Sequence, residues 1–155
     1  MNYARFAAAP ALLLALILAG CGLTSSPADN LTFKAPKGWS GSPGIMGFMQ
    51  FWKAPGSDEV LMVFRSPKPL KTTEVFNSAD LRDAKVENQK AITICGSQPA
   101  EFFKAQGTSK GGHDSNIEMV MTNAGGATYM AMYVYPVGIA VNADAEAALR
   151  QLCTK

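Results

Sequence analysis

The residue types that support catalysis are scarce in this sequence of 155 residues. Its single histidine, His113, lies in a Gly-Gly-His-Asp segment, and Asp114 follows it directly. A serine or cysteine nucleophile needs a base held beside it, and adjacent residues seldom have the mutual geometry of a catalytic histidine and its orienting carboxylate. The 12 acidic residues include no pair whose spacing indicates acid–base chemistry. We therefore expect no catalytic residues and a protein that is not an enzyme.

Metal, nucleotide and nucleic-acid binding also lack the residues that they need. A zinc site takes about four nitrogen, sulfur or oxygen ligands, whereas the chain has one histidine and three cysteines with no short cysteine spacing. Gly41, Gly44 and Gly47 are not followed by the Lys-Ser/Thr pair of a phosphate-binding loop. The chain has 14 basic and 12 acidic residues. One basic residue, Arg5, lies in an apolar N-terminal segment discussed below, and without it the balance is 13 to 12. Such a nearly neutral charge does not attract nucleic acid. The sequence predicts no metal, no cofactor and no nucleic-acid partner.

A predicted hairpin brings four methionines together as two facing pairs. Residues 117–122 and 129–135 are strand-like and flank Gly125 and Gly126, a good signal for a two-residue turn. Antiparallel pairing about these glycines places three pairs of side chains opposite each other: Met121 and Met130, Met119 and Met132, Ile117 and Val134. Thioethers are soft ligands for Cu(I), but methionine also fills apolar cores. Because Ile117 and Val134 continue the same face, we favour core packing and keep copper binding as an alternative.

The opposite face of this hairpin is rich in tyrosine. It carries Glu118, Val120, Thr122, Tyr129, Tyr133 and Tyr135. Together with Trp39 and Trp52, the tyrosines either pack beneath a helix or line a pocket for a lipid or another apolar ligand. We favour packing because aromatic side chains usually form cores.

The first 21 residues have the form of an export signal. An apolar run over residues 6–19 is shorter than the roughly 20 residues that cross a bilayer as a helix, and it matches the apolar region of a secretory signal. The segment ends in Leu18-Ala19-Gly20-Cys21, which resembles the lipobox of bacterial lipoprotein precursors. The resemblance implies cleavage after Gly20, a diacylglyceryl thioether on Cys21 and acylation of the new amino terminus. A plain secretory cleavage or a buried cysteine is the alternative.

The predicted anchor divides the chain into three parts: a signal peptide over residues 1–20, the lipidated cysteine and a linker over 21–30, and one α+β domain over 31–155. Residues 22–30 are rich in serine, proline and small polar types and have no apolar periodicity, which indicates a linker. A linker of this length reaches at most about 30 Å, so acyl chains on Cys21 would hold the domain close to the membrane. By the same resemblance, Gly22 after the lipidated cysteine implies the periplasmic face of the outer membrane in a Gram-negative cell.

The two other cysteines, Cys95 and Cys153, are an even pair in a chain that we expect to be exported, and we predict that they form a disulfide. The bridge would close a loop of about 59 residues, for which the chain-entropy model gives about 4 kcal/mol of stabilisation. Two separate thiols or an intermolecular bond through Cys153 are the alternatives.

Alternating or apolar runs bounded by glycine and proline predict seven strands, at residues 31–35, 48–52, 60–64, 91–95, 100–106, 117–122 and 129–135. The third is apolar at every position, so we place it centrally with both sheet faces covered. Spaced apolar residues predict a helix over 73–86, and a second over 142–153 that Asn142 caps. This order predicts the α+β class, with an antiparallel sheet of about six or seven strands and helices packed on its faces.

The order of elements resembles the PsbP-like proteins, whose member in photosystem II assists the oxygen-evolving complex. The matching features are the early strand Leu31-Thr-Phe-Lys-Ala-Pro-Lys-Gly-Trp39, the mid-chain helix, the strand end at Cys95-Gly96 and the closing helix. The resemblance covers nearly all of residues 31–153. It implies an α/β/α sandwich and an accessory or interaction module, and it brings no catalytic residues.

These observations together predict a membrane-anchored lipoprotein of the bacterial envelope with a non-catalytic interaction or accessory domain. Its expected partners are the membrane, through the lipid on Cys21, and an envelope protein. The alternative is a carrier in the envelope that binds a small ligand or copper.

Overall fold

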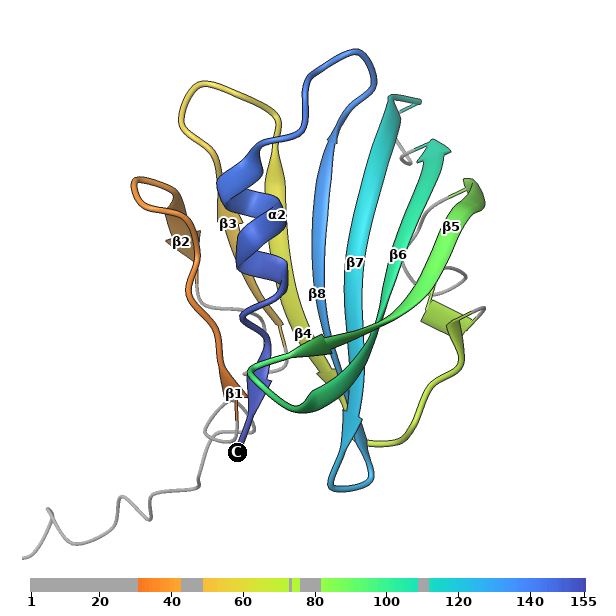
Figure 1. Cartoon of the computed structure of the whole chain (residues 1–155). Helices are drawn as coiled ribbons and strands as arrows, with labels where there is room; N and C mark the ends of the chain where they lie inside the picture. Colours follow the sequence, from red (N-terminus) through yellow and green to blue (C-terminus); the bar gives the residue numbers. More distant parts are fainter. Residues whose placement is uncertain (1–30, 43–48, 73, 76–81, 109–111) are drawn as a thin grey trace, which may run out of the picture.

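Figure 1 shows the computed structural model of the chain, which describes residues 31–42, 49–72, 74–75, 82–108 and 112–155. The predictions for the signal peptide, for Cys21 and for the linker concern residues 1–30 and lie outside the described residues.

Seven strands form one antiparallel sheet. In order across the sheet they are β2 (Ser40–Ser42), β3 (Met49–Lys53), β4 (Val60–Ser66), β8 (Ala127–Pro136), β7 (Asp114–Ala124), β6 (Gln98–Thr108) and β5 (Arg82–Ile94). Strands β5 to β8 form a meander of consecutive pairs, and β4 joins the N-terminal strands to it by pairing with β8. The continuously apolar strand predicted at 60–64 is therefore in the sheet interior, as its composition indicates.

A second, two-stranded sheet closes one end of the molecule. Strand β1 (Leu31–Thr32) pairs antiparallel with β9 (Cys153–Thr154), with Leu31 opposite Thr154. The start of the described fold and the C-terminal strand consequently lie side by side (Figure 1). Gln98 supports this end, because its side-chain oxygen accepts a hydrogen bond from the N–H of Thr154 at 3.0 Å.

The glycine-based register of the β7–β8 hairpin is confirmed. Gly125 and Gly126 have φ values of 57° and 76°, the left-handed region that both central residues of a tight hairpin turn must adopt. The pairing places Met121 opposite Met130 and Met119 opposite Met132, as predicted.

Both faces of the sheet are covered by apolar side chains. On one face, α2 (Ala143–Leu149) packs Ala145, Ala148 and Leu149 onto a core of aliphatic and aromatic residues that includes Tyr133 and Phe102. On the other face, the methionine side chains pack with Phe103, Ile117 and residues of the segment between β4 and β5, among them Leu70 and Val75.

The predicted α/β/α sandwich, with helices on the faces of the sheet, is wrong. The described residues are mostly β, and their longest helix, α2, covers one face only. A largely irregular segment covers the methionine face within the described part of the chain. The fold is therefore a seven-stranded antiparallel sheet with a small second sheet and a short helix.

The helix predicted over residues 73–86 is the main source of that error. The described part of this segment contains a short helical turn around Val75, and residues 82–86 belong to β5, where Val86 pairs with Ala105. In residues 82–86 the pairing with β6 satisfies the backbone, and the register is shifted between Arg82 and Lys85 and between Val86 and Asn88, so a strand forms where the apolar spacing predicts a helix. Residues 76–81 of the predicted helix lie outside the described residues. The closing helix is also shorter than predicted, since α2 ends at Leu149.

Candidate interaction surface

The loop between β8 and α2 presents three aliphatic side chains to solvent. Val137, Ile139 and Val141 are 50%, 53% and 40% exposed. Single exposed aliphatic residues are ordinary, but exposed apolar side chains that gather in one place mark interaction sites. Figure 1 shows this loop at the end of the sheet opposite to β1, β9 and the C-terminus. Residues 137–141 are called the apolar tip below.

Backbone hydrogen bonds fix the shape of the apolar tip. The N–H of Val137 donates to the carbonyl of Asp114 at 3.2 Å, and the N–H of Ile139 donates to the carbonyl of Pro136 at 3.3 Å. Gly138 has a φ of 88°, a left-handed conformation that glycine adopts without strain. The chain therefore reverses direction at a defined turn between two exposed aliphatic residues.

Asn142 joins the apolar tip to α2. Its side-chain oxygen accepts hydrogen bonds from the N–H groups of Asp144 at 3.1 Å and Ala145 at 3.3 Å, which caps the helix as predicted. Its own N–H donates to the hydroxyl of Tyr133 at 3.2 Å. Both ends of the tip are consequently held, which lowers the entropy that it would lose on binding.

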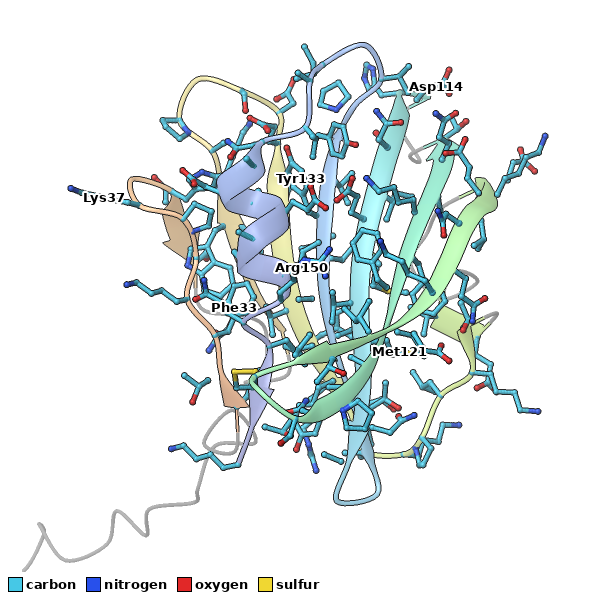
Figure 2. All side chains as sticks on the ribbon, in the orientation of Figure 1. Phe33, Lys37, Asp114, Met121, Tyr133 and Arg150 are labelled. Carbon is cyan, nitrogen blue, oxygen red and sulfur yellow. A yellow bond between two sulfur atoms is a disulfide. The ribbon has the colours of Figure 1, made fainter. Side chains whose placement is uncertain are left out.

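Tyr133 lies behind α2 and is fully buried (Figure 2). Its hydroxyl donates to the carboxylate of Glu59 while it accepts the bond from Asn142. Burial raises the pKa of Tyr133, and the hydrogen bond to Glu59 raises it further. The ring stacks on Tyr135 with centroids 4.7 Å apart. The tyrosines therefore pack beneath the helix, which was the favoured prediction.

Glu118 is a buried carboxylate at 1% exposure on the same face. Its Oε1 accepts a hydrogen bond from Lys104 Nζ at 2.6 Å and a longer one from the Tyr135 hydroxyl at 3.4 Å. Its Oε2 has no partner among the described residues. Burial and then the charge of Glu118 raise the pKa of Tyr135 to about 12. This network joins β6, β7 and β8 beneath α2 and supports the strand that carries the apolar tip.

Three cations cover Phe102 beside this network. Lys90, Lys104 and Arg150 lie 5.2, 5.7 and 5.3 Å from the centre of its ring. Figure 2 shows Arg150 at the C-terminal end of α2. Cation–π attraction and the apolar stems of these side chains close this face of the core.

The four paired methionines, Met119, Met121, Met130 and Met132, are all buried. They pack with Phe103, Ile117 and other apolar side chains. Because they are buried among apolar neighbours, they are core residues, which is the interpretation favoured from the sequence.

A cleft of about 530 Å³ opens on the methionine side, near Met121 (Figure 2). Leu70 and Met121 contribute apolar surface, while Lys71 and Glu101 contribute opposite charges. Its volume is in the range of small-ligand sites. Sequence reasoning missed this cleft because residues from four distant segments form it.

A smaller recess of about 290 Å³ lies directly beside the apolar tip, with Val137 in its wall. The carboxylates of Asp83 and Asp114 also line it, together with Lys85. Asp114 is held in place by Thr108, whose hydroxyl donates to its Oδ1 at 2.9 Å. The recess and the tip share Val137 and thus form one continuous surface that is apolar at the tip and charged in the recess.

The predicted disulfide between Cys95 and Cys153 is present in the structure, with the Cα atoms 5.7 Å apart. It ties the turn between β5 and β6 to β9. The two cysteines are 58 positions apart in the sequence. The bridge therefore attaches the β5–β6 hairpin to the small β1–β9 sheet.

His113 lies at the start of the β7 hairpin, beside Asp114, and is exposed. Sequence reasoning passed over a Gly-x-Ser-x-Gly match at residues 107–111. Gly107 is in β6, so the match follows an antiparallel strand and leads to β7, whereas the hydrolase elbow connects a strand to a helix. Ser109 itself is outside the described residues.

The described residues provide neither a metal-binding cluster nor a membrane-spanning helix. They contain no group of three or more histidine, cysteine, aspartate or glutamate side chains arranged to hold a metal ion. No helix among them has the length and apolar character required to cross a membrane.

No family model matches the chain, and no curated protein matches it in sequence. Its fold is similar to solved structures. A crystal structure from Bacteroides thetaiotaomicron VPI-5482 has a TM-score of 0.56 at 13% identity, covering 84% of this chain and 47% of that chain. This chain therefore spans about half the length of that protein.

The solution structure of cyanobacterial PsbP (CyanoP) from Synechocystis sp. PCC 6803 has a TM-score of 0.51 at 20% identity, covering 73% of this chain and 78% of that chain. The described domain is thus PsbP-like in fold. At this level of identity the likeness concerns the fold alone.

Proposed function

We propose that this protein is a lipid-anchored component of the bacterial cell envelope whose folded domain is a non-catalytic interaction module. A lipid on Cys21 would hold the module at the membrane, and the apolar tip would bind an envelope protein. In a Gram-negative cell the proposed location is the periplasmic face of the outer membrane.

The position of the apolar tip is the observation that carries this proposal. The chain enters the described fold at Leu31, beside the C-terminal strand, and the tip lies at the opposite end (Figure 1). An anchor ten residues before Leu31 would therefore hold one end near the bilayer and direct the other away from it. Restriction to a thin layer raises the effective concentration of the tip for partners in the same membrane region.

The anchor is tested by metabolic palmitate labelling of the wild type beside Cys21→Ser, together with membrane fractionation. The expected result is a labelled, membrane-bound wild type and an unlabelled variant released from the membrane. A variant that is still labelled and still membrane-bound would refute the anchor at Cys21.

The cleft near Met121 supports a second candidate function, a carrier for a small ligand. Its opposite charges, Lys71 and Glu101, lie beside apolar surface, a combination that orients a small molecule with both polar and apolar parts. Native mass spectrometry of protein purified from its own envelope tests this function. A bound mass that is lost in Glu101→Gln supports the carrier, and a clean apo mass counts against it.

A further inference from the structure

We infer that the apolar tip inserts into an apolar pocket of a protein partner whose rim carries basic side chains. The inference rests on the proposed function and gives the chemistry of the partner.

The concentration of exposed apolar surface supports insertion. Five large apolar side chains are exposed among the described residues: Phe51, Val86, Val137, Ile139 and Val141. Three of these five lie in the tip. Transfer of such side chains into a partner's pocket removes apolar area from water, which is the main driving force of association.

Hydrogen bonds hold the tip in one conformation, which favours a preformed binding loop over a loop that becomes ordered only on binding. Hydrogen bonds to Asp114 and Pro136 hold its first part, and the capped helix holds its end at Asn142. A side chain such as Ile139 is therefore presented without a large entropic cost.

The charges around the tip specify the rim of the partner. Asp83 and Asp114 line the recess beside Val137, and Asp144 lies in the first turn of α2. Among the described residues that line the recess, Lys85 is the one cation, and no ion pair joins it to either aspartate. Excess negative charge around an apolar centre is complementary to a basic rim.

The same charges argue against a lipid surface and against a second copy of this chain. Anionic lipids would be repelled by the aspartates, and two tips facing each other would bring like charges together. Distance also disfavours the anchoring membrane, because β8 alone, with 10 residues, extends about 33 Å. The linker from Cys21 reaches only about 30 Å.

Photo-crosslinking in intact cells tests the inference with the full, anchored chain. A benzophenone amino acid is placed at Ile139, and at Phe51 and Val86 as controls, which are 41% and 43% exposed but lie outside the tip. We expect a discrete protein adduct from position 139 that the controls do not give. The double substitution Val137→Ser and Val141→Ser should abolish it, while circular dichroism shows an unchanged fold.

The basic rim is tested by the double substitution Asp83→Asn and Asp114→Asn, which keeps the shape of the recess and the acceptor for Thr108. We expect about fivefold less adduct at low salt, and no change in Glu101→Gln, a carboxylate in the distant cleft. Mass spectrometry of the adduct should place the crosslink beside lysine or arginine residues of the partner.

Four outcomes would overturn the inference: an adduct of twice the chain's mass, a lipid adduct, an adduct insensitive to the aspartate substitutions, or protein adducts from Phe51 or Val86 alone. The last of these would leave an interaction module with another docking surface, so the proposed function would stand. If a correctly anchored chain gives no protein adduct from any of the three positions, both the inference about the apolar tip and the proposed interaction function would be contradicted.

Discussion

The hydroxyl of Tyr133 accepts a hydrogen bond from the backbone N–H of Asn142 at 3.2 Å, which links the centre of β8 to the cap of α2. The apolar tip, residues 137–141, lies between them in the chain. This contact holds the tip in place because Tyr133 is itself fixed by burial and by its bond to Glu59.

Removing the hydroxyl in Tyr133→Phe should lower the free energy of unfolding by about 1–3 kcal/mol, since Oε1 of Glu59 loses its donor and the Asn142 N–H loses its acceptor. Urea unfolding followed by circular dichroism measures the change. Tyr135→Phe is the matched control, because its hydroxyl makes one long bond of 3.4 Å to Glu118, and it should cost less. Equal losses in the two variants would contradict the role given to Tyr133.

Stability should fall at alkaline pH because of the buried tyrosines. The pKa of Tyr135 is raised to about 12 in the folded state, whereas an unfolded tyrosine titrates near about 10. The folded state therefore keeps the proton longer, and its advantage is complete below pH 10 and is lost as pH rises from about 10 to about 12. Tyr135→Phe should show a shallower loss over this range. Urea midpoints from pH 8 to 12 that fall equally in both proteins would exclude this contribution.

The disulfide should contribute a large part of the stability. Cys95 and Cys153 are separated by 58 positions, for which the chain-entropy model gives about 4 kcal/mol. The double substitution Cys95→Ala and Cys153→Ala should cost about 2–4 kcal/mol and increase amide hydrogen exchange in the turn between β5 and β6. Reduced wild-type protein is the control and should behave like the variant. Unchanged unfolding after reduction would show that the closed end is stable without the bridge.

The ion pair between the partly exposed Lys104 and the buried Glu118 should show coupling. Lys104→Met removes the nearer hydrogen-bond donor of the buried Glu118 carboxylate, and should cost about 1–3 kcal/mol, because the Lys104 side chain is 41% exposed and water screens the pair. The double variant Lys104→Met and Glu118→Gln removes that charge and should recover much of the loss. A double-mutant cycle of unfolding free energies measures the coupling. Additive effects would mean that the two side chains do not depend on each other.

Several parts of this fold can be predicted from the sequence because a local signal decides them. Gly125 and Gly126 determine the turn and, with it, the register that pairs the methionines. Asn142 marks the start of α2, and the even number of remaining cysteines indicates the bridge between Cys95 and Cys153.

Other parts depend on distant contacts that no local pattern contains. The apolar spacing near Val86 is compatible with a helix, and only the presence of β6 beside it makes a strand. The apolar tip was not singled out either, because Val137, Ile139 and Val141 would be expected in a core. Their exposure follows from the way that the β8–α2 connection projects beyond the sheet (Figure 1).

The mass of the native polypeptide, extracted from membranes in detergent, tests the central claim most directly. The account predicts a chain that begins at Cys21 and carries a diacylglyceryl thioether and an acylated amino terminus. A native chain with no acyl mass, recovered in the soluble fraction, would contradict both the anchor and the presentation of the apolar tip that depends on it.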